Sequence, residues 1–157
     1  MKVNEYRQLD LQEDRIDMYY REKNKEVNEI LQYLKKHSQR LIGKSEDTEV
    51  VFSLNDVYYF ESVDKKTFAC LKEQILRIDS RLQDLEEAYY EFGCIRVNKS
   101  TVLNVYHVDS LTSELNMKVM AKLDNGEKIQ INRSYKAKFH NFLKMMSKRG
   151  ILDESDQ

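Results

Sequence analysis

The sequence of 157 residues contains no proline and only four glycines, at positions 43, 93, 126 and 150. This scarcity excludes low-complexity linkers rich in either residue, and we find no internal repeat. No apolar run approaches the roughly 18 residues of a membrane-spanning helix. The segment Met1–Glu5 also lacks the apolar core and the cleavage site of a secretory signal. The sequence therefore predicts a protein of about one domain that stays in the cytoplasm.

Cysteine and histidine are scarce, and their positions argue against metal or covalent chemistry. Cys70 and Cys94 lie 24 residues apart, which fits neither a disulfide framework nor a zinc pair, so we expect two small buried residues. His37, His107 and His140 fall in different predicted elements and show no metal-ligand spacing. The sequence also lacks a glycine-rich phosphate loop and a nucleophile elbow. We therefore expect no enzyme, no metal and no cofactor.

The net charge of −1 hides an uneven distribution. Residues 1–92 contain 15 Lys and Arg against 20 Asp and Glu, which gives a net charge of −5. Residues 93–150 contain 11 against 4, which gives +7, and the tail 151–157 adds three acids. A basic C-terminal half suits a polyanionic partner. Taken alone, however, the charge pattern fits a solvated and balanced surface better.

Helical periodicity predicts three helices. Apolar residues spaced three and four apart predict amphipathic helices over 23–38 and 134–148. A shorter helix follows Ser80, which would form a capping box with Gln83. The apolar stripe of the helix over 23–38 is expected to pack on the rest of the protein, although it could also be a docking surface or a dimer contact.

Most of the remaining sequence predicts short strands. The turn sequence Asp124–Glu127 predicts a tight hairpin, because Asn-Gly readily adopts positive φ angles. Strands and helices do not alternate, which excludes a doubly wound nucleotide-binding fold and a phosphate-accepting receiver domain. The predicted fold class is mainly β (α+β) with peripheral helices. Patterns of β-branched, aromatic and alternating apolar residues predict strands over 2–7, 15–20, 50–54, 57–62, 67–72, 74–78, 94–101, 102–105, 106–109, 117–123 and 128–131.

Three short stretches combine cations with small polar side chains: Lys65-Lys66, the segment 96–100, and Asn132-Arg133-Ser134. Lysine and arginine can bind phosphates and guanine acceptors, while amides and hydroxyls both donate and accept hydrogen bonds. Asparagine and serine also favour turns and helix caps, so turn chemistry explains any single stretch more simply. The three stretches therefore indicate a nucleic-acid-binding function only when they are considered together.

At these residues the sequence resembles a known family. Segment 92–105, which reads Phe-Gly-Cys-Ile-Arg-Val-Asn-Lys-Ser-Thr-Val-Leu-Asn-Val, is similar to the core motif of LytTR DNA-binding domains. Asp56–Glu61 resembles the first strand of that family, and Leu82–Glu86 resembles its short helix. Gly126 followed by Asn132–Tyr135 resembles its ending. The likeness covers residues 45–145 in four ordered blocks, which makes it far more specific than a single motif.

The resemblance implies a fold of short strands in small sheets that binds duplex DNA through loops. These loops would enter successive major grooves across a bend and regulate transcription, commonly as a homodimer on directly repeated sites. Asn98 stands where many members have histidine, and Asn132 where many have serine. The resemblance also implies that Ser100 and Asn104 brace the loop. The candidate DNA-binding residues are Lys65, Lys66, Thr67, Asn98, Lys99, Ser100, Asn132 and Arg133.

The resemblance also divides the chain, with an N-terminal extension over 1–44, a DNA-binding domain over 45–149 and a flexible tail over 150–157. Many members carry a phosphorylated receiver before the domain, whereas this chain is similar to the stand-alone regulators. In that group a small membrane protein encoded nearby often holds the regulator inactive, so such an inhibitor is an implied partner.

Two functions of different classes remain open. The first is a sequence-specific DNA-binding transcription regulator, which the basic segment 93–150 and the four ordered blocks favour. The second is a cytoplasmic β-rich adaptor that binds proteins and no nucleic acid. The acidic first half and the apolar stripe at 27–34 favour this adaptor.

Overall fold

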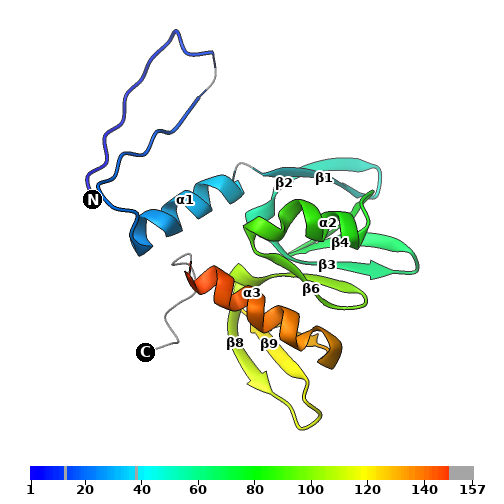
Figure 1. Ribbon diagram of the computed structural model, residues 1–157. Coiled ribbons are helices and arrows are strands. Elements are labelled where there is room, and N and C mark those ends of the chain that lie inside the picture. The colour runs from blue at the N-terminus through cyan, green and yellow to red at the C-terminus, as the bar shows by residue number, and fades with distance from the viewer. Residues whose placement is uncertain (13, 38, 149–157) are drawn as a thin grey trace.

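The computed structural model describes residues 1–12, 14–37 and 39–148 and consists mainly of antiparallel strands with helices on the outside (Figure 1). This arrangement confirms the predicted mainly β (α+β) class. The α-helices are α1 (Lys25–His37), α2 (Leu82–Tyr89) and α3 (Lys136–Lys148). Short 3-10 turns are η1 (Leu54–Asp56), η2 (Tyr90–Phe92), η3 (Val105–His107) and η4 (Arg133–Tyr135). The strands are β1 (Arg40–Ser45), β2 (Thr48–Ser53), β3 (Val57–Val63), β4 (Lys66–Leu71), β5 (Ile75–Ile78), β6 (Cys94–Asn98), β7 (Thr101–Asn104), β8 (Val108–Ser113), β9 (Val119–Leu123) and β10 (Lys128–Ile131).

The strands of the described chain form two sheets. The larger sheet has the order β2-β1-β5-β4-β3-β7-β6, and the smaller has the order β10-β9-β8. Neighbouring strands pair antiparallel throughout, as short connections between consecutive strands allow. The parallel strand–helix–strand units of a doubly wound fold are therefore absent from the described chain.

The larger sheet separates two apolar cores. Val102 and Leu103 are neighbours in β7, and successive strand residues point to opposite faces. Val102 packs with Phe60 and with Leu85 of α2, whereas Leu103 belongs to the second cluster, under the smaller sheet and α3. In that cluster α3 buries Phe139 completely, and full burial of such a side chain stabilises a fold by about 1.5–3 kcal/mol. The central strands are thus held from both sides.

The first helix begins and packs much as the sequence predicts. Asn24 caps α1, because its Oδ1 accepts a hydrogen bond from the backbone N–H of Val27 at 2.9 Å. Val27 is buried, and the next residues of the apolar stripe, Ile30 and Leu31, are half-buried. The helix lies against η1 and η2 of the domain. Its apolar stripe therefore packs on the protein's own surface.

Several predicted boundaries are wrong. The segments 2–7 and 15–20 form no strand, because no other segment of the described chain pairs with them. The expected Ser80 capping box is absent: Arg81 is the N-cap of α2, and the Gln83 Nε2 donates to Glu87 at 3.3 Å instead. The expected strand over 106–109 is replaced by η3 as far as His107, and β8 begins at Val108. The predicted tail over 150–157 lies outside the described residues.

Strand β1 is missing from the sequence prediction. Its only inward-facing residues are Leu41 and Gly43, so the apolar pattern is too sparse to detect. Gly43 is required by packing, because a Cβ atom at that position would lie 2.8 Å from the Cβ of Leu76 in β5. A tertiary contact therefore selects glycine here, although glycine is locally unfavourable in a strand.

Candidate nucleic-acid interface

The turns β3–β4 and β6–β7 lie side by side at one end of the larger sheet. Strands β3 and β7 pair with Glu61 opposite Thr101, and the Ser62 N–H donates to the Ser100 carbonyl at 2.8 Å. The β3–β4 turn is tight, since Asp64 and Lys65 have φ angles of 51° and 65°. This pairing brings the Lys65 turn next to the loop between β6 and β7.

Two hydrogen bonds fasten the segment before α3 to the same place. The Asn132 N–H donates to the Val97 carbonyl at 3.0 Å. In return, the Asn98 Nδ2 donates to the Gln130 carbonyl at 3.0 Å. These bonds join β6 of the larger sheet to the end of β10 in the smaller one. They therefore hold Arg133, the next residue along the chain, close to the β6–β7 loop.

The β6–β7 loop is braced from within. The Asn98 Oδ1 accepts hydrogen bonds from the backbone N–H of Ser100 at 2.9 Å and from its hydroxyl at 3.1 Å. The guanidinium of Arg96 donates to two loop carbonyls, that of Asn98 at 3.0 Å through Nε and that of Lys99 through Nη2. The backbone of Lys99 is therefore fixed while its side chain stays exposed.

A carboxylate links this loop to two helices. Glu86 of α2 accepts a hydrogen bond from the backbone N–H of Arg96 at 2.6 Å and forms a salt bridge with Lys138 of α3 at 3.1 Å. The Glu86 side chain is only 16% exposed, so this pair is better shielded from solvent than an ordinary surface pair. The contact fixes β6, α2 and α3 relative to one another.

The eight predicted site residues occupy three kinds of environment. Among the described residues, no salt bridge involves a cation of these loops. Asn98, Ser100 and Asn132 are half-buried, and Thr67 is buried at the start of β4. The exposed side chains are the four cations Lys65, Lys66, Lys99 and Arg133. The structure thus brings the predicted loops together and presents their positive charges to solvent.

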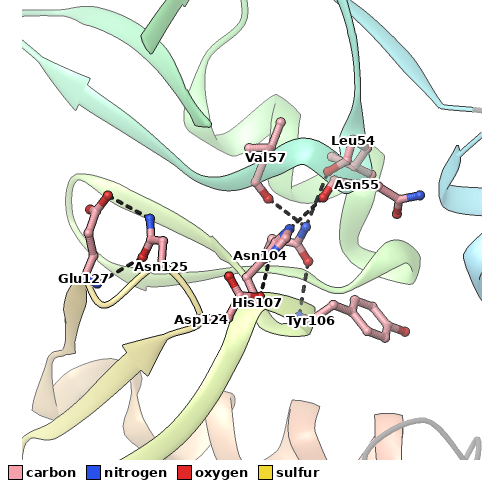
Figure 2. Close-up of polar contacts among 9 residues, drawn as sticks. All are labelled: Leu54, Asn55, Val57, Asn104, Tyr106, His107, Asp124, Asn125 and Glu127. Carbon is pink, nitrogen blue, oxygen red and sulfur yellow. Dashed lines mark hydrogen bonds and ion pairs between the residues drawn. The ribbon is translucent and has the colours of Figure 1, made fainter. Parts of the chain in front are cut away.

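A second polar cluster, which no sequence motif predicts, lies at the other end of β3 (Figure 2). His107 lies 2.6 Å from the Asn55 carbonyl through Nε2 and 3.0 Å from the Asp124 carboxylate through Nδ1. Its ring stacks on Tyr58 with centroids 4.0 Å apart. His107 thus joins the two sheets, because Asn55 precedes β3 of the larger sheet and Asp124 follows β9 of the smaller one.

The cluster shifts two pKa values. The hydrogen bond between Tyr58 and Asp124, together with burial, raises the pKa of Tyr58 to about 12. Burial by itself would raise the pKa of the Asp124 carboxyl. Hydrogen bonds from Tyr58 and His107, together with nearby positive charge, outweigh burial and leave that pKa below its usual value. Asp124 therefore stays ionised under ordinary conditions.

The hydrogen bonds of Asn104 to Val57 and Tyr106 lie away from the β6–β7 loop, contrary to the expectation that Asn104 braces that loop. Its Nδ2 donates to the Val57 carbonyl at 2.8 Å, and its Oδ1 accepts from the Tyr106 N–H at 3.3 Å (Figure 2). Asn104 is the last residue of β7, whereas Ser100 immediately precedes the first. It therefore fixes the start of β3 and of η3, at the end of the sheet opposite the loops.

The described residues show few features of other site types. No group of three or more His, Cys, Asp or Glu among them could hold a metal ion. None of their helices is long and apolar enough to cross a membrane. Cys70 and Cys94 are both buried, as predicted, and burial raises the pKa of the Cys70 thiol to about 11. Neither cysteine has the environment of a reactive thiolate.

Comparison with known proteins identifies the fold and the family. A family model described as the LytTr DNA-binding domain matches residues 47–144. The chain belongs to this family. A solved LytTr DNA-binding domain from Bacillus cereus superimposes with a TM-score of 0.64 at 25% identity, covering 68% of this chain and 97% of that one. The LytTR resemblance of the sequence is thereby confirmed.

Relatives in Staphylococcus aureus extend the similarity beyond the domain. Proteins named as uncharacterized HTH-type transcriptional regulators match this LytTR chain at 25% identity over 86% of its length and 92% of theirs in strain NCTC 8325 / PS 47. In strain MRSA252 the match is 26% identical over 74% of this chain and 80% of the relative. The chain is a DNA-binding transcription regulator, and the adaptor alternative is not favoured. Its family is not a class of enzymes.

Proposed function

We propose that this LytTR protein reads specific sequences in successive major grooves of duplex DNA through the three loops that carry Lys65, Lys99 and Arg133. One observation carries the proposal: hydrogen bonds join the three loops at one end of the sheets, with their cations exposed. A rigid set of cations suits a double helix, because phosphates supply most of the affinity and fixed side chains can reach base edges.

The different environments of the predicted site residues suggest that these residues have different roles in DNA binding. Lys99 and Arg133 project from braced backbones, which suits hydrogen bonds to guanine acceptors. Lys65 and Lys66 lie on a tight turn and suit phosphate contacts. The four uncharged residues of the predicted site support the cations. Asn98 and Ser100 hold the β6–β7 loop, Thr67 follows the β3–β4 turn opposite Ser62, and Asn132 anchors η4.

Loops are better placed than a helix for this task. A helix-turn-helix needs two helices joined by a short turn. In the described chain five strands separate α1 from α2, and five more separate α2 from α3. The cations instead follow strand ends. The HTH in the names of the relatives therefore does not describe the geometry found here.

The proposal extends to partners and place of action. Two copies act as a homodimer on directly repeated promoter sites in the cytoplasm, and a small inhibitory membrane protein encoded nearby is the proposed controlling partner. We assign no catalytic activity and no cofactor. These parts of the proposal rest on the family relationship and on the exposed cations. Because the cations are exposed, an inhibitor could reach the proposed DNA-binding surface.

The proposal is tested by titrating the protein against DNA from upstream of its own coding region and against a scrambled duplex. Arg133→Ala should weaken specific binding about 10- to 100-fold, the worth of one bidentate base contact, and change scrambled binding little. Lys65→Ala should reduce the slope of log affinity against log salt by about one, because one phosphate contact is lost.

Lys72 provides a matched control. It is an exposed lysine just after β4, at the end of that strand opposite Lys66. Lys72→Ala should leave both affinities unchanged. Equal losses on specific and scrambled DNA for Arg133→Ala would contradict base reading. A protein with no sequence preference that leaves DNA at slightly raised salt would instead behave like the adaptor.

A further inference from the structure

The first 20 residues, here called the arm, project away from both sheets as an open loop that leads into α1 (Figure 1). No described residue of the arm belongs to a helix or strand. Its large apolar side chains nevertheless face solvent, and Val3, Tyr6 and Tyr19 are 85%, 85% and 91% exposed. Met1, Leu9, Leu11, Ile16 and Tyr20 are exposed as well. Apolar exposure on this scale marks a surface that binds another molecule.

The described residues on the two sides of the arm also lack strand pairing. The sequence predicts strands over 2–7 and 15–20, yet neither segment joins a ladder within the described chain. Extended segments with unpaired N–H and C=O groups are templates for pairing with another chain. The failed strand prediction and the apolar exposure thus point to the same missing component, a strand from outside this chain.

The distribution of charge along the arm suits a second copy of this chain as that component. Residues 1–8 carry Lys2 and Arg7 against Glu5, a net charge of +1, whereas residues 9–20 carry four acids against Arg15, a net charge of −3. The one ion pair described within the arm, Arg15 with Asp17 at 3.2 Å, is exposed and leaves this excess of acid in place. Two arms side by side in opposite directions would set each basic half against an acidic half. Such a surface is self-complementary, as a two-fold interface requires.

We propose that the arms of two copies pair with each other, segment 2–7 of one against segment 15–20 of the other, and bury their apolar side chains between them. The pairing deepens the dimeric part of the proposed function and needs no DNA. It also leaves the three cationic loops free. Residues 21–24, between the arm and α1, form neither helix nor strand. Residues 21–24 can therefore act as a joint between the arm and the domain. The two paired arms can be related by two-fold symmetry while the two domains bind directly repeated sites in the same orientation.

Light scattering on the full chain tests this proposal, because it measures the molar mass of the protein in solution. The wild-type protein should have twice the chain mass of 18.8 kDa without DNA. Tyr6→Asp combined with Tyr19→Asp should give a monomer, because charges would enter the paired apolar surface. Tyr33→Asp is the matched control, since Tyr33 is an exposed tyrosine of α1 outside the arm, and it should leave the dimer intact. A monomeric wild type, or a dimer that survives the double substitution, would overturn the proposal.

Charge reversal separates pairing between arms from docking of the arm elsewhere. Lys2→Glu with Arg7→Glu should weaken the dimer at least 10-fold at low salt. Adding Asp14→Lys and Asp17→Lys should restore it, because both halves then change sign together. If the arm bound the open edge of β2 in the other copy, the second pair of substitutions would bring no restoration, and that result would refute pairing between arms.

The DNA measurements keep the two proposals distinguishable. The monomeric arm variant should bind a duplex with a single site as tightly as the wild type does. A wild-type dimer that binds no DNA would refute the proposed function and leave arm pairing standing. A wild-type monomer that binds its promoter would refute arm pairing alone.

Discussion

Asn98 supplies one of the two hydrogen bonds that join the two sheets at the proposed DNA surface, and Asn98→Ala should weaken that junction. The substitution removes a hydrogen bond to the Gln130 carbonyl at 3.0 Å and two from Ser100, at 2.9 and 3.1 Å. Each is worth about 0.5–1.5 kcal/mol net. Because the site is half-buried, water replaces part of this loss. We therefore expect the free energy of unfolding to fall by about 2–3 kcal/mol, which lowers Tm by about 4–12 °C.

Urea and thermal unfolding followed by circular dichroism measure this cost, with Ser100→Ala as the control. That variant loses only the hydroxyl bond at 3.1 Å and should be destabilised by about 0.5–1.5 kcal/mol. Asn98→Ala should also reduce the ratio of specific to scrambled DNA affinity, because one of the two hydrogen bonds that hold Arg133 close to the loop of Lys99 is lost. A stability within about 0.5 kcal/mol of the wild type, or an unchanged affinity ratio in a destabilised protein, would refute the reasoning.

Three further predictions concern other parts of the frame. Arg96→Lys should cost about 1–2 kcal/mol in urea unfolding and lower the preference for specific DNA, since a lysine cannot bridge both loop carbonyls. Gly93→Ala should cost about 2–4 kcal/mol in the same assay, because φ is 97° and the new Cβ would lie 2.3 Å from the Tyr106 ring. Gly126→Ala, at φ 90° with open space, should cost only about 1–2 kcal/mol; equal losses at the two glycines would contradict the clash. Folding lowers the pKa of the Asp124 carboxyl, so the ionised carboxylate stabilises the folded protein. This stabilisation is complete above the ordinary carboxyl pKa of about 4, and it is lost as pH falls through the lower pKa of the folded state. Asp124→Asn should therefore flatten the unfolding free energy measured between pH 7 and pH 3, and an unchanged profile would contradict the role of the carboxylate.

Local signals in the sequence predict much of the fold. The Asp124–Glu127 hairpin forms as expected, with Asn125 accepting from the Glu127 N–H at 3.0 Å and Gly126 at a φ of 90°. The helices α1 and α3 also follow their apolar periodicity. Each of these elements depends on residues within about two helical turns, so a short window of sequence contains the whole signal.

Failures occur where the deciding contact is distant. No strand is predicted around Gly43, and only the close approach of Leu76 in the folded protein explains why a glycine stands in β1. The segment 15–20 has strand-forming residues but pairs with no strand in the part of the chain that the structure describes. The two bonds that position Arg133 join residue 97 to 132 and residue 98 to 130, so only the resemblance to a family suggested that these loops meet. The His107 cluster depends on partners 17 and 52 residues away, which no local pattern reveals.

Cleavage of DNA by iron chelates attached to single cysteines tests most directly whether the three loops grip the double helix. Cys70 and Cys94 are 3% and 0% exposed, so added cysteines would take the label selectively. Val63→Cys beside the first loop and Ser134→Cys beside Arg133 should cut promoter DNA in separate grooves about one helical turn, or roughly 10 base pairs, apart. Lys72→Cys, at the far end of β4, should cut little. Equal cutting from Lys72→Cys, or no cutting from the two loop positions, would show that DNA lies on another surface.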